Sequence, residues 1–175
     1  MRNKKVLFTT QAAMIAALYV VLTLLANALG LANYAVQIRF SESLTILPFF
    51  TPAAIPGLTI GCLLSNLLTG CMPLDIVFGS LATFLGAVGT WLLRKHSSMA
   101  PLPPIVANTL IVPFILAYVY QFEGSVPYFM LTVGIGEILS CGVLGMILLG
   151  VLMKYRNVLF KTELTEQKLT AKKRI

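Results

Sequence analysis

Long apolar segments with few charged residues are the feature that most limits what this chain can fold into. Residues 6–38 contain no charged side chain, and further apolar segments follow at residues 53–70, 74–93, 104–121 and 126–153. About 20 apolar residues are enough to cross the hydrocarbon core of a bilayer as a helix. The 175 residues are 58% hydrophobic and only 11% charged, whereas soluble domains average about 25% charged residues. The sequence therefore predicts an all-α, polytopic membrane protein that is dissolved in the lipid bilayer.

Lys and Arg residues collect in three blocks outside these segments. Of the 13, 12 are Arg2, Lys4 and Lys5, Arg94 and Lys95, or lie within residues 154–174. Cytoplasmic loops and tails next to membrane spans are rich in Lys and Arg, so we expect all three blocks, and both termini, in the cytoplasm. The net charge of +7 does not predict nucleic-acid binding, because long apolar segments separate the blocks and no single basic surface is expected.

The number of spans must be even if both termini are cytoplasmic, but the apolar segments number five. The missing span is predicted at residues 40–50. At about 1.5 Å per residue this stretch is too short for a full crossing, so we expect a short or broken helix packed inside the protein. The prediction is six transmembrane helices, the second one short, in a membrane domain of residues 1–153, followed by a basic cytoplasmic tail of residues 154–175.

Two of the predicted spans carry an acidic residue within a stripe of small residues. One helical face holds Asp75, Gly79, Ala82, Gly86 and Gly89, another holds Gly134, Glu137, Cys141 and Gly145, and Gly57 and Gly61 form a third close-packing pair. Small residues let membrane helices pack closely, but a charge near mid-membrane costs roughly 2.5–3.5 kcal/mol and usually faces a cavity or a partner. Glu137, near half depth, is the strongest functional candidate. Two structural alternatives stay open: pairing of Glu137 with Arg39, and Asp75 as a helix-start residue favoured by the helix dipole.

Polar side chains within the predicted spans gather toward the outer side of the membrane. The outer third holds Asn33, Tyr34, Gln37, Arg39, Glu42, Asn66, Asp75, Tyr118, Tyr120, Glu123 and Tyr128. The inner half offers little beyond Asn108 and the interfacial Trp91. This distribution predicts a pocket that opens outward, unlike an ion channel, which needs polar or carbonyl groups along its whole length.

Motifs for other chemistry are absent from the sequence. No G-x-x-x-x-G-K-[ST] motif occurs, so this chain is expected to hold no cofactor, and ATP-driven work is assigned to a partner. The three cysteines are not in C-x-x-C spacing and His96 stands alone, so no metal site is predicted. Glu137 together with Asp75 faintly resembles the paired carboxylates of intramembrane aspartic proteases, although those enzymes use Asp in both places.

Several stretches carry a resemblance to a known family. They are residues 36–57 (VQIRFSESLTILPFFTPAAIPG), residues 74–83 (LDIVFGSLAT), residues 101–104 (PLPP) with Asn108, and the pair Gly136 and Glu137. This pattern resembles the QueT family, whose members are classed with the substrate-binding S components of energy-coupling factor transporters. The resemblance implies six spans in a bacterial cell membrane, uptake of a queuosine precursor (7-cyano- or 7-aminomethyl-7-deazaguanine), and partnership with a transmembrane coupling subunit and two ATPases.

The resemblance also suggests roles for particular residues. S components dock on the coupling subunit through an A-x-x-x-A surface of the first helix, which Ala12 and Ala16 or Ala13 and Ala17 would supply. For the ligand we expect Glu137 to hold the guanine-like edge, Asp75 or Glu42 to meet the amine, and Asn66 to complete the polar shell. The expected site also includes Arg39, with Tyr118, Tyr128 or Tyr34 stacking on the base, and residues 31–37 with the short second span as a lid. The alternatives are a different vitamin-like heterocycle, an intramembrane enzyme or a structural membrane subunit.

Overall fold

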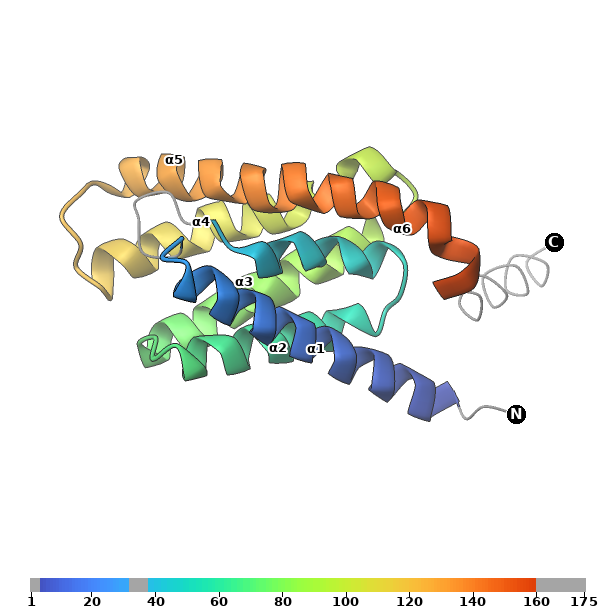
Figure 1. The fold of residues 1–175 in the computed structure, drawn as a ribbon. Helices are drawn as coiled ribbons and strands as arrows, with labels where there is room; N and C mark the ends of the chain where they lie inside the picture. Colours follow the sequence, from blue (N-terminus) through green and yellow to red (C-terminus); the bar gives the residue numbers. More distant parts are fainter. Residues whose placement is uncertain (1–3, 32–37, 160–175) are drawn as a thin grey trace.

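The computed structural model describes residues 4–31 and 38–159, and these residues form helices and connecting turns without a strand. The predicted lid loop with Asn33, Tyr34 and Gln37, and the tail from residue 160 onward, lie outside the described residues. Six α-helices follow in order: α1 (Lys4–Ala28), α2 (Ala54–Leu68), α3 (Pro73–Leu92), α4 (Leu102–Tyr118), α5 (Val126–Glu137) and α6 (Gly145–Leu159). The helices form one elongated bundle, in which the start of α1 and the end of α6 lie at the same end (Figure 1).

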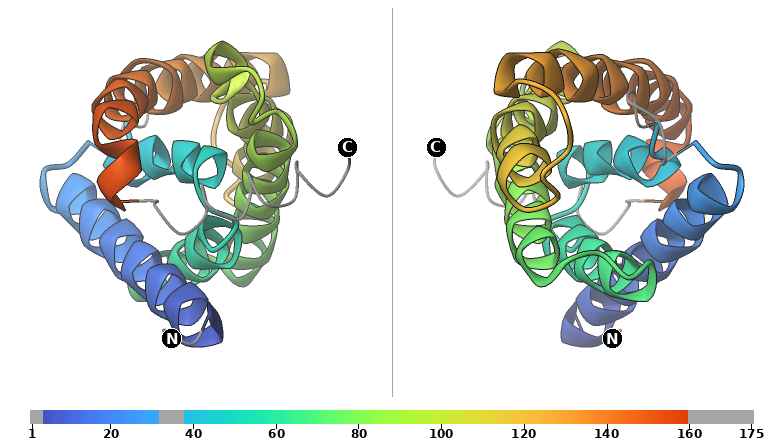
Figure 2. Two further views of the ribbon diagram at one scale, coloured as in Figure 1. Left: turned by 90° about the vertical axis from the view of Figure 1, so that its right-hand side faces the viewer. Right: turned by 90° about the vertical axis from the view of Figure 1, so that its left-hand side faces the viewer.

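The predicted short second span is a 3₁₀-helix, η1 (Phe40–Phe49), and not an α-helix. At about 2.0 Å per residue, its 10 residues fall short of the roughly 30 Å of a hydrocarbon core. Eight of them are buried, including Glu42 and Pro48. Seen along the bundle axis, η1 lies inside a ring of longer helices (Figure 2). The predicted short helix packed within the protein is therefore confirmed, because the surrounding helices protect its irregular backbone from lipid.

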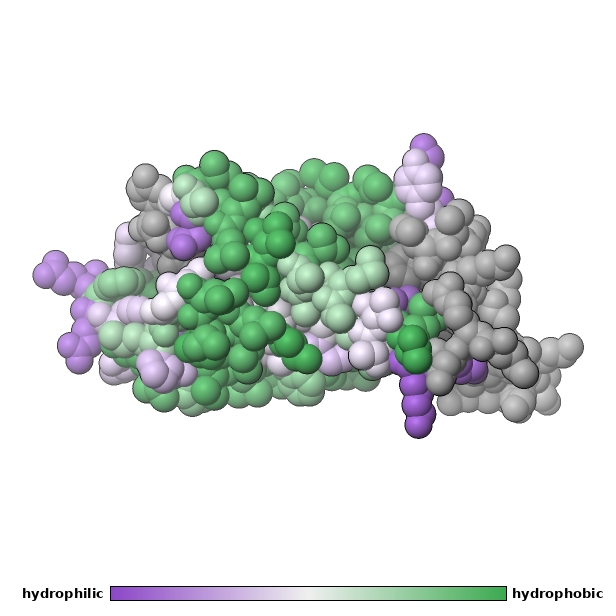
Figure 3. Space-filling model, turned by 60° about the horizontal axis from the view of Figure 1, so that its bottom comes forward, coloured by the Kyte–Doolittle hydropathy of each residue, from purple (hydrophilic) through white to green (hydrophobic). Residues whose placement is uncertain are grey.

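Within residues 4–31 and 38–159, four helical stretches are long and apolar enough to cross a membrane: Lys4–Ala28, Pro73–Leu92, Ser97–Tyr118 and Val126–Arg156. The fifth apolar helix, α2, is shorter, with 15 residues. The outer surface is strongly apolar: Leu67, Leu68 and Leu92 are 58%, 64% and 70% exposed. A hydrophobic band covers much of the face shown in Figure 3, with polar residues toward its two ends. Soluble proteins rarely expose a contiguous apolar surface of this extent, and together with the four long apolar helices it makes the chain a multi-pass membrane protein.

The last predicted span, residues 126–153, contains a π-helix, η3 (Ile138–Leu144), that begins directly after Glu137. The stretch Val126–Arg156 remains one continuous helix, as the predicted span requires, and η3 changes only its hydrogen-bond pattern between α5 and α6. π-Helical turns occur often at functional sites. Here the turn packs against η1, and the Oγ of Ser140 accepts a hydrogen bond from the backbone N–H of Arg39 at 3.2 Å.

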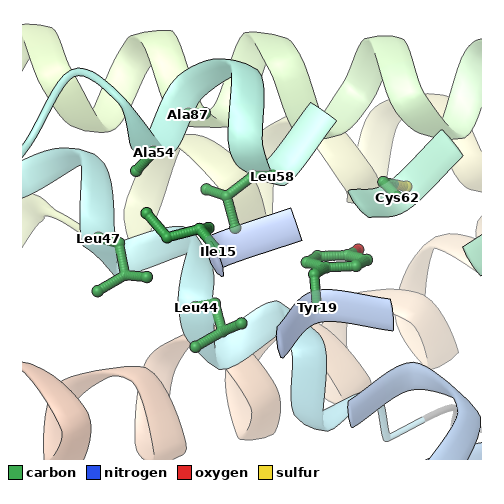
Figure 4. Packing of buried hydrophobic residues seen from close by; sticks show 8 residues of the cluster. All are labelled: Ile15, Tyr19, Leu44, Leu47, Ala54, Leu58, Cys62 and Ala87. Atoms are coloured by element: carbon green, nitrogen blue, oxygen red, sulfur yellow. The ribbon is translucent and has the colours of Figure 1, made fainter. Parts of the chain in front are cut away.

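The glycine motifs form the predicted close helix contacts. A Cβ at Gly57 would lie 2.7 Å from the carbonyl oxygen of Ala12, and one at Gly61 would lie 2.7 Å from the Cβ of Tyr19. Beside this contact, Ile15, Tyr19, Leu44, Leu47, Ala54, Leu58, Cys62 and Ala87 form an apolar core between α1, η1, α2 and α3 (Figure 4). Backbones that approach this closely tolerate only glycine, which explains the G-x-x-x-G spacing.

Candidate functional site

A cavity of about 490 Å³ lies at one end of the bundle, where α1, α2 and α4 end and α3 and α5 begin. We call this the large cavity, and this end of the molecule the cavity end. Its polar lining consists of Thr23, Asn27, Arg39, Asn66, Thr69, Asp75, Tyr120, Glu123, Tyr128 and Thr132. Its apolar lining includes Val112, Ile115, Leu116, Phe122 and Phe129. A mixed lining and a volume between about 300 and 1,000 Å³ are typical of small-molecule sites.

The turn between α2 and α3 places two buried polar side chains on the large cavity. Gly70 has φ +73° in this turn, a conformation that glycine adopts without steric cost. Pro73 then starts α3 and puts Asp75 in its first turn, where a carboxylate is favoured by the helix dipole. Asp75 is therefore a helix-start residue, as one alternative held, and it also lines the cavity, with Asn66 of the preceding helix beside it.

Gly79 leaves room for this pair. A Cβ there would lie 3.1 Å from Nδ2 of Asn66 and 3.3 Å from Oδ1 of Asp75. Both side chains are buried, with exposures of 2% for Asn66 and 8% for Asp75. Within the described part of the chain, neither the Oδ1 of Asn66 nor the Oδ1 of Asp75 accepts a hydrogen bond. Two acceptor oxygens without a donor from the described residues, at the wall of a cavity, suit a ligand that carries N–H groups.

Tyr120 holds the other oxygen of Asp75. Its hydroxyl donates to Oδ2 of Asp75 at 2.8 Å and accepts a hydrogen bond from the backbone N–H of Met72 at 3.2 Å. Burial raises the pKa of Tyr120, and the hydrogen bond to Asp75 acts in the same direction. The phenol therefore stays protonated and donates, which orients the Asp75 carboxylate from the side opposite its free oxygen.

Deeper in the bundle, the carboxyl groups of Glu137 and Glu42 lie on either side of Asn108. Asn108 of α4 donates from Nδ2 to Oε1 of Glu137 at 3.0 Å and reaches Oε2 of Glu42 at 3.5 Å. The hydroxyl of Tyr19 donates to the other oxygen of Glu42, and the Sγ of Cys141 lies 3.1 Å from Oε2 of Glu137. We call these five residues the deep carboxyl cluster. It joins α1, η1, α4, α5 and η3, although its members lie as far apart in sequence as residues 19 and 141.

The alternatives for Glu137 can be compared with this geometry. Glu137 is 9% exposed, and its hydrogen-bond partners are Asn108 and Cys141. Its carboxyl partner is Glu42 and not Asp75, which lies with Tyr120. Glu137 and Asp75 both line a small cavity beneath the large one, but no hydrogen bond joins them among the described residues, unlike the directly paired carboxylates of an aspartic protease.

The deep carboxyl cluster is also the place where a metal ion would fit best among the described residues. One oxygen each of Glu42 and Glu137 and the Sγ of Cys141 lie within 4.8 Å of one another, a grouping that the sequence did not suggest. These ligand atoms already take part in hydrogen bonds with Tyr19, Asn108 or each other. We assign no metal to the cluster.

Some of the predicted site residues lie around the large cavity, and others lie elsewhere. The structure brings Arg39, Asn66, Asp75 and Tyr128 to the large cavity, and it places Glu42 and Glu137 just beneath. Tyr118 is not brought there: it is 71% exposed, and its ring stacks on Phe114 on the outer surface. Asn108 was noted only as an isolated polar residue, and the one signal for its role was its place in the family-like motif.

The four alanines proposed for docking divide between two faces of α1. Ala16 is buried against Gly61, and Ala12 contacts Gly57, so these two belong to the contact between α1 and α2. Ala13 and Ala17 are exposed. A partner could reach only the second pair without separating α1 from α2.

Fold and site together define a class: a helical, multi-pass membrane protein with a polar, small-molecule-sized cavity at one end. The chain belongs to the QueT transporter family, whose model matches residues 9–154. A curated relative, the queuosine precursor transporter QueT of Lactococcus lactis subsp. cremoris (strain MG1363), is 34% identical over 85 residues, which are 49% of this chain and 50% of that protein. The matched region thus spans about half the length of this relative. No solved structure matches the chain.

Proposed function

We propose that this protein is the substrate-binding S component of an energy-coupling factor transporter in a bacterial cell membrane. It captures a queuosine precursor, 7-cyano- or 7-aminomethyl-7-deazaguanine, from outside for ATP-driven uptake. Family membership and the name of the Lactococcus relative support transport of this class of molecule. The observation that carries the proposal is the pair of buried acceptors, Asn66 and Asp75, on a 490 Å³ cavity.

The chemistry of a 7-deazaguanine fits this pair. Its pyrimidine edge presents two N–H donors side by side, which one carboxylate accepts together. Asp75 has a free oxygen directed at the cavity lining, and a hydrogen bond to a charged group contributes roughly 1.5–3 kcal/mol. Sequence reasoning gave this edge to Glu137, but Glu137 does not line the large cavity. We therefore assign the edge to Asp75, with the amide of Asn66 serving the carbonyl or the pyrrole N–H.

Aromatic rings are available for the flat face of the base. Tyr120 and Phe122 stack on each other with ring centroids 5.5 Å apart, and Tyr128 meets Phe129 edge-on at 5.7 Å. All four residues line the large cavity. A planar heterocycle gains from offset stacking on such rings, so we assign this role to Tyr128 and its neighbours and leave out Tyr118.

Energy for transport comes from partner subunits in this proposal. The sequence has no nucleotide-binding loop, and the proposed role as an S component assigns ATP hydrolysis to two ATPases joined through a transmembrane coupling subunit. The exposed Ala13 and Ala17 give α1 a smooth surface on which another helix can pack closely. Replacing Ala17 by Leu is expected to reduce assembly with the coupling subunit, measured by co-purification, and to leave ligand binding unchanged. Replacing the exposed Met14 by Leu is the matched control, and equal assembly of both variants would contradict docking at this face.

The test of the substrate is calorimetric binding to the detergent-purified full chain. Both 7-deazaguanine precursors are titrated, with guanine and riboflavin as controls. One-to-one binding of a precursor, at least tenfold tighter than either control (about 1.4 kcal/mol), is the expected result. Absence of binding to both precursors would remove the substrate assignment, and tight binding of riboflavin would point to another vitamin-like heterocycle.

A further inference from the structure

A second, much smaller cavity lies next to the large one. Its volume is about 20 Å³, and Arg39, Asp75 and Val112 line both cavities. A volume of this size holds about one water molecule, and an ammonium group occupies a similar space. The small cavity is therefore a side chamber of the proposed binding site that accepts one small polar group.

The lining of the small cavity is strongly acidic. Three carboxyl groups face it, from Glu42, Asp75 and Glu137, together with one guanidinium, that of Arg39. The three carboxylic acids are between 2% and 9% exposed. Buried charges are stable only when they are paired and hydrogen-bonded, and ionisable groups within membrane segments usually serve a ligand or an ion. This chamber favours a cation.

The acceptor capacity of the chamber is incompletely used. Glu42 and Glu137 each receive hydrogen bonds from two protein donors, but a carboxylate offers about four lone-pair positions. The Oδ1 of Asp75, a residue that is 92% buried, takes no donor from the described residues. That oxygen lies 3.3 Å from the Cβ position of Gly79, another lining residue of the chamber. With this Asp75 oxygen given to the base edge, the lone pairs left over on Glu42 and Glu137 point to a donor-rich group as occupant.

We propose that the small cavity binds a primary ammonium group on a short arm of the ligand. This inference rests on the proposed function, and within it the chamber selects the aminomethyl precursor over the nitrile. A primary amine with a pKa near that of Lys, about 10.4, is charged at neutral pH and offers three N–H donors. A nitrile has no donor, and its nitrogen lone pair would face carboxylate oxygens. The amine at the end of the arm lies between Glu42 and Glu137, and the ring system lies in the large cavity.

The experiment compares three ligands that differ only at position 7: the aminomethyl, the nitrile and the unsubstituted 7-deazaguanine. Calorimetry on the detergent-purified full chain should give at least tenfold tighter binding of the aminomethyl compound than of the other two. Glu137→Gln keeps the size of the side chain and removes its ability to form a carboxylate. It should weaken aminomethyl binding at least tenfold and nitrile binding less than threefold, and Glu42→Gln should act in the same direction.

Tyr118→Phe is the control, because Tyr118 is 71% exposed and lines neither cavity. It should change the preference for the aminomethyl compound less than about threefold, as expected for a surface substitution away from the site. Nitrile binding and thermal unfolding report whether each variant is folded. If a Gln variant does not fold, the proposal is tested by the ratio of aminomethyl to nitrile affinity in the wild-type chain.

The outcomes separate the two proposals. Equal or tighter binding of the nitrile by the wild-type chain would overturn the ammonium site and leave the proposed function standing. Loss of both precursors in equal measure in Glu137→Gln would also overturn it, since Glu137 would then act on the base. No binding of any of the three ligands would overturn both proposals together.

Discussion

The cavity end and the opposite end of the bundle are built from the same helices but packed in different ways. At the opposite end, which we call the closed end, α3 and α4 touch: a Cβ at Gly86 would lie 2.7 Å from the Cα of Pro104, and one at Gly89 would lie 2.5 Å from the Cβ of Pro103. At the cavity end, Asp75 of α3 and Leu116 of α4 both line a 490 Å³ cavity. The same helix pair is therefore in contact at one end and lines an open space at the other.

The difference shows how side-chain size controls helix separation in a membrane. Phe49, Phe50, Ala100 and Leu149 fill the space behind the closed end. Because lipid and apolar side chains are equally apolar, membrane helices gain little from burying surface and depend on close contacts. Glycine facing proline gives such a contact, whereas polar and aromatic side chains at the cavity end leave room for a ligand. Substitutions at the closed end should therefore affect folding, and those at the cavity end should affect binding.

The largest effect is expected from Gly86→Val at the closed end. The added side chain collides with the backbone of Pro104, and overpacking of this kind lowers the free energy of unfolding by about 3 kcal/mol. Thermal unfolding in detergent measures the change. Gly150→Val is the control, since a Cβ at Gly150 meets nothing within 4 Å. Equal stability of both variants would show that the contact between α3 and α4 is not what closes this end.

At the cavity end, Asp75→Asn should weaken precursor binding at least tenfold, because the neutral amide loses a charged acceptor worth roughly 1.5–3 kcal/mol. Unfolding should change little, since the side chain faces a cavity and no tight contact. Calorimetry and thermal unfolding, measured on the same sample, check both statements. Tyr118→Phe removes a polar group from the outer surface and should leave affinity unchanged; an equal loss in both variants would contradict the assignment of the site to the cavity.

A smaller effect is expected from Gly79→Ala. Its Cβ would press on the ends of Asn66 and Asp75, at 3.1 and 3.3 Å, so both acceptors must shift by a few tenths of an ångström. Loss of about one hydrogen bond, near 1 kcal/mol, corresponds to about fivefold weaker binding. Gly134→Ala, whose Cβ would meet Thr109 at an ordinary 3.6 Å, is the matched control. Unaltered affinity in Gly79→Ala would mean that the two side chains do not hold the ligand together.

The smallest effect is expected from Tyr120→Phe. The variant loses the hydroxyl that donates to Asp75 and accepts from Met72, but it keeps the ring that stacks on Phe122. Asp75 stays in the cavity and is less well oriented, so affinity should fall about threefold, the equivalent of one modest hydrogen bond. Calorimetric titration measures it. A loss as large as that of Asp75→Asn would indicate that the hydroxyl of Tyr120 itself contacts the ligand.

The sequence by itself determined the class of protein and much of its outline. Apolar segments of about 20 residues are stable only in the lipid bilayer. Because the obvious segments are odd in number, the sequence also predicted a short helix at residues 40–50, where the structure has η1. The gathering of polar residues toward one end predicted the cavity. These features depend on short stretches of sequence or on composition, so they can be predicted without knowing which helices are in contact. The membrane side of the termini stays a prediction from the positions of Lys and Arg.

Only the tertiary structure decided which of several similar residues, such as neighbouring tyrosines or alanines of one helix, faces the site. Successive helical residues point about 100° apart, so the rotation of a helix about its own axis separates candidates that sequence treats alike. Tyr120 reaches the cavity and Tyr118 faces outward; Ala16 packs on Gly61 and Ala17 is exposed.

The deep carboxyl cluster depends on tertiary structure for the same reason. Glu42 meets Glu137 through Asn108, and this contact needs the packing of three elements and a π-helical turn that no local pattern indicates. The periodicity of the sequence predicts on which face of a helix a residue lies. Which neighbouring helix packs against that face is determined only by the tertiary structure.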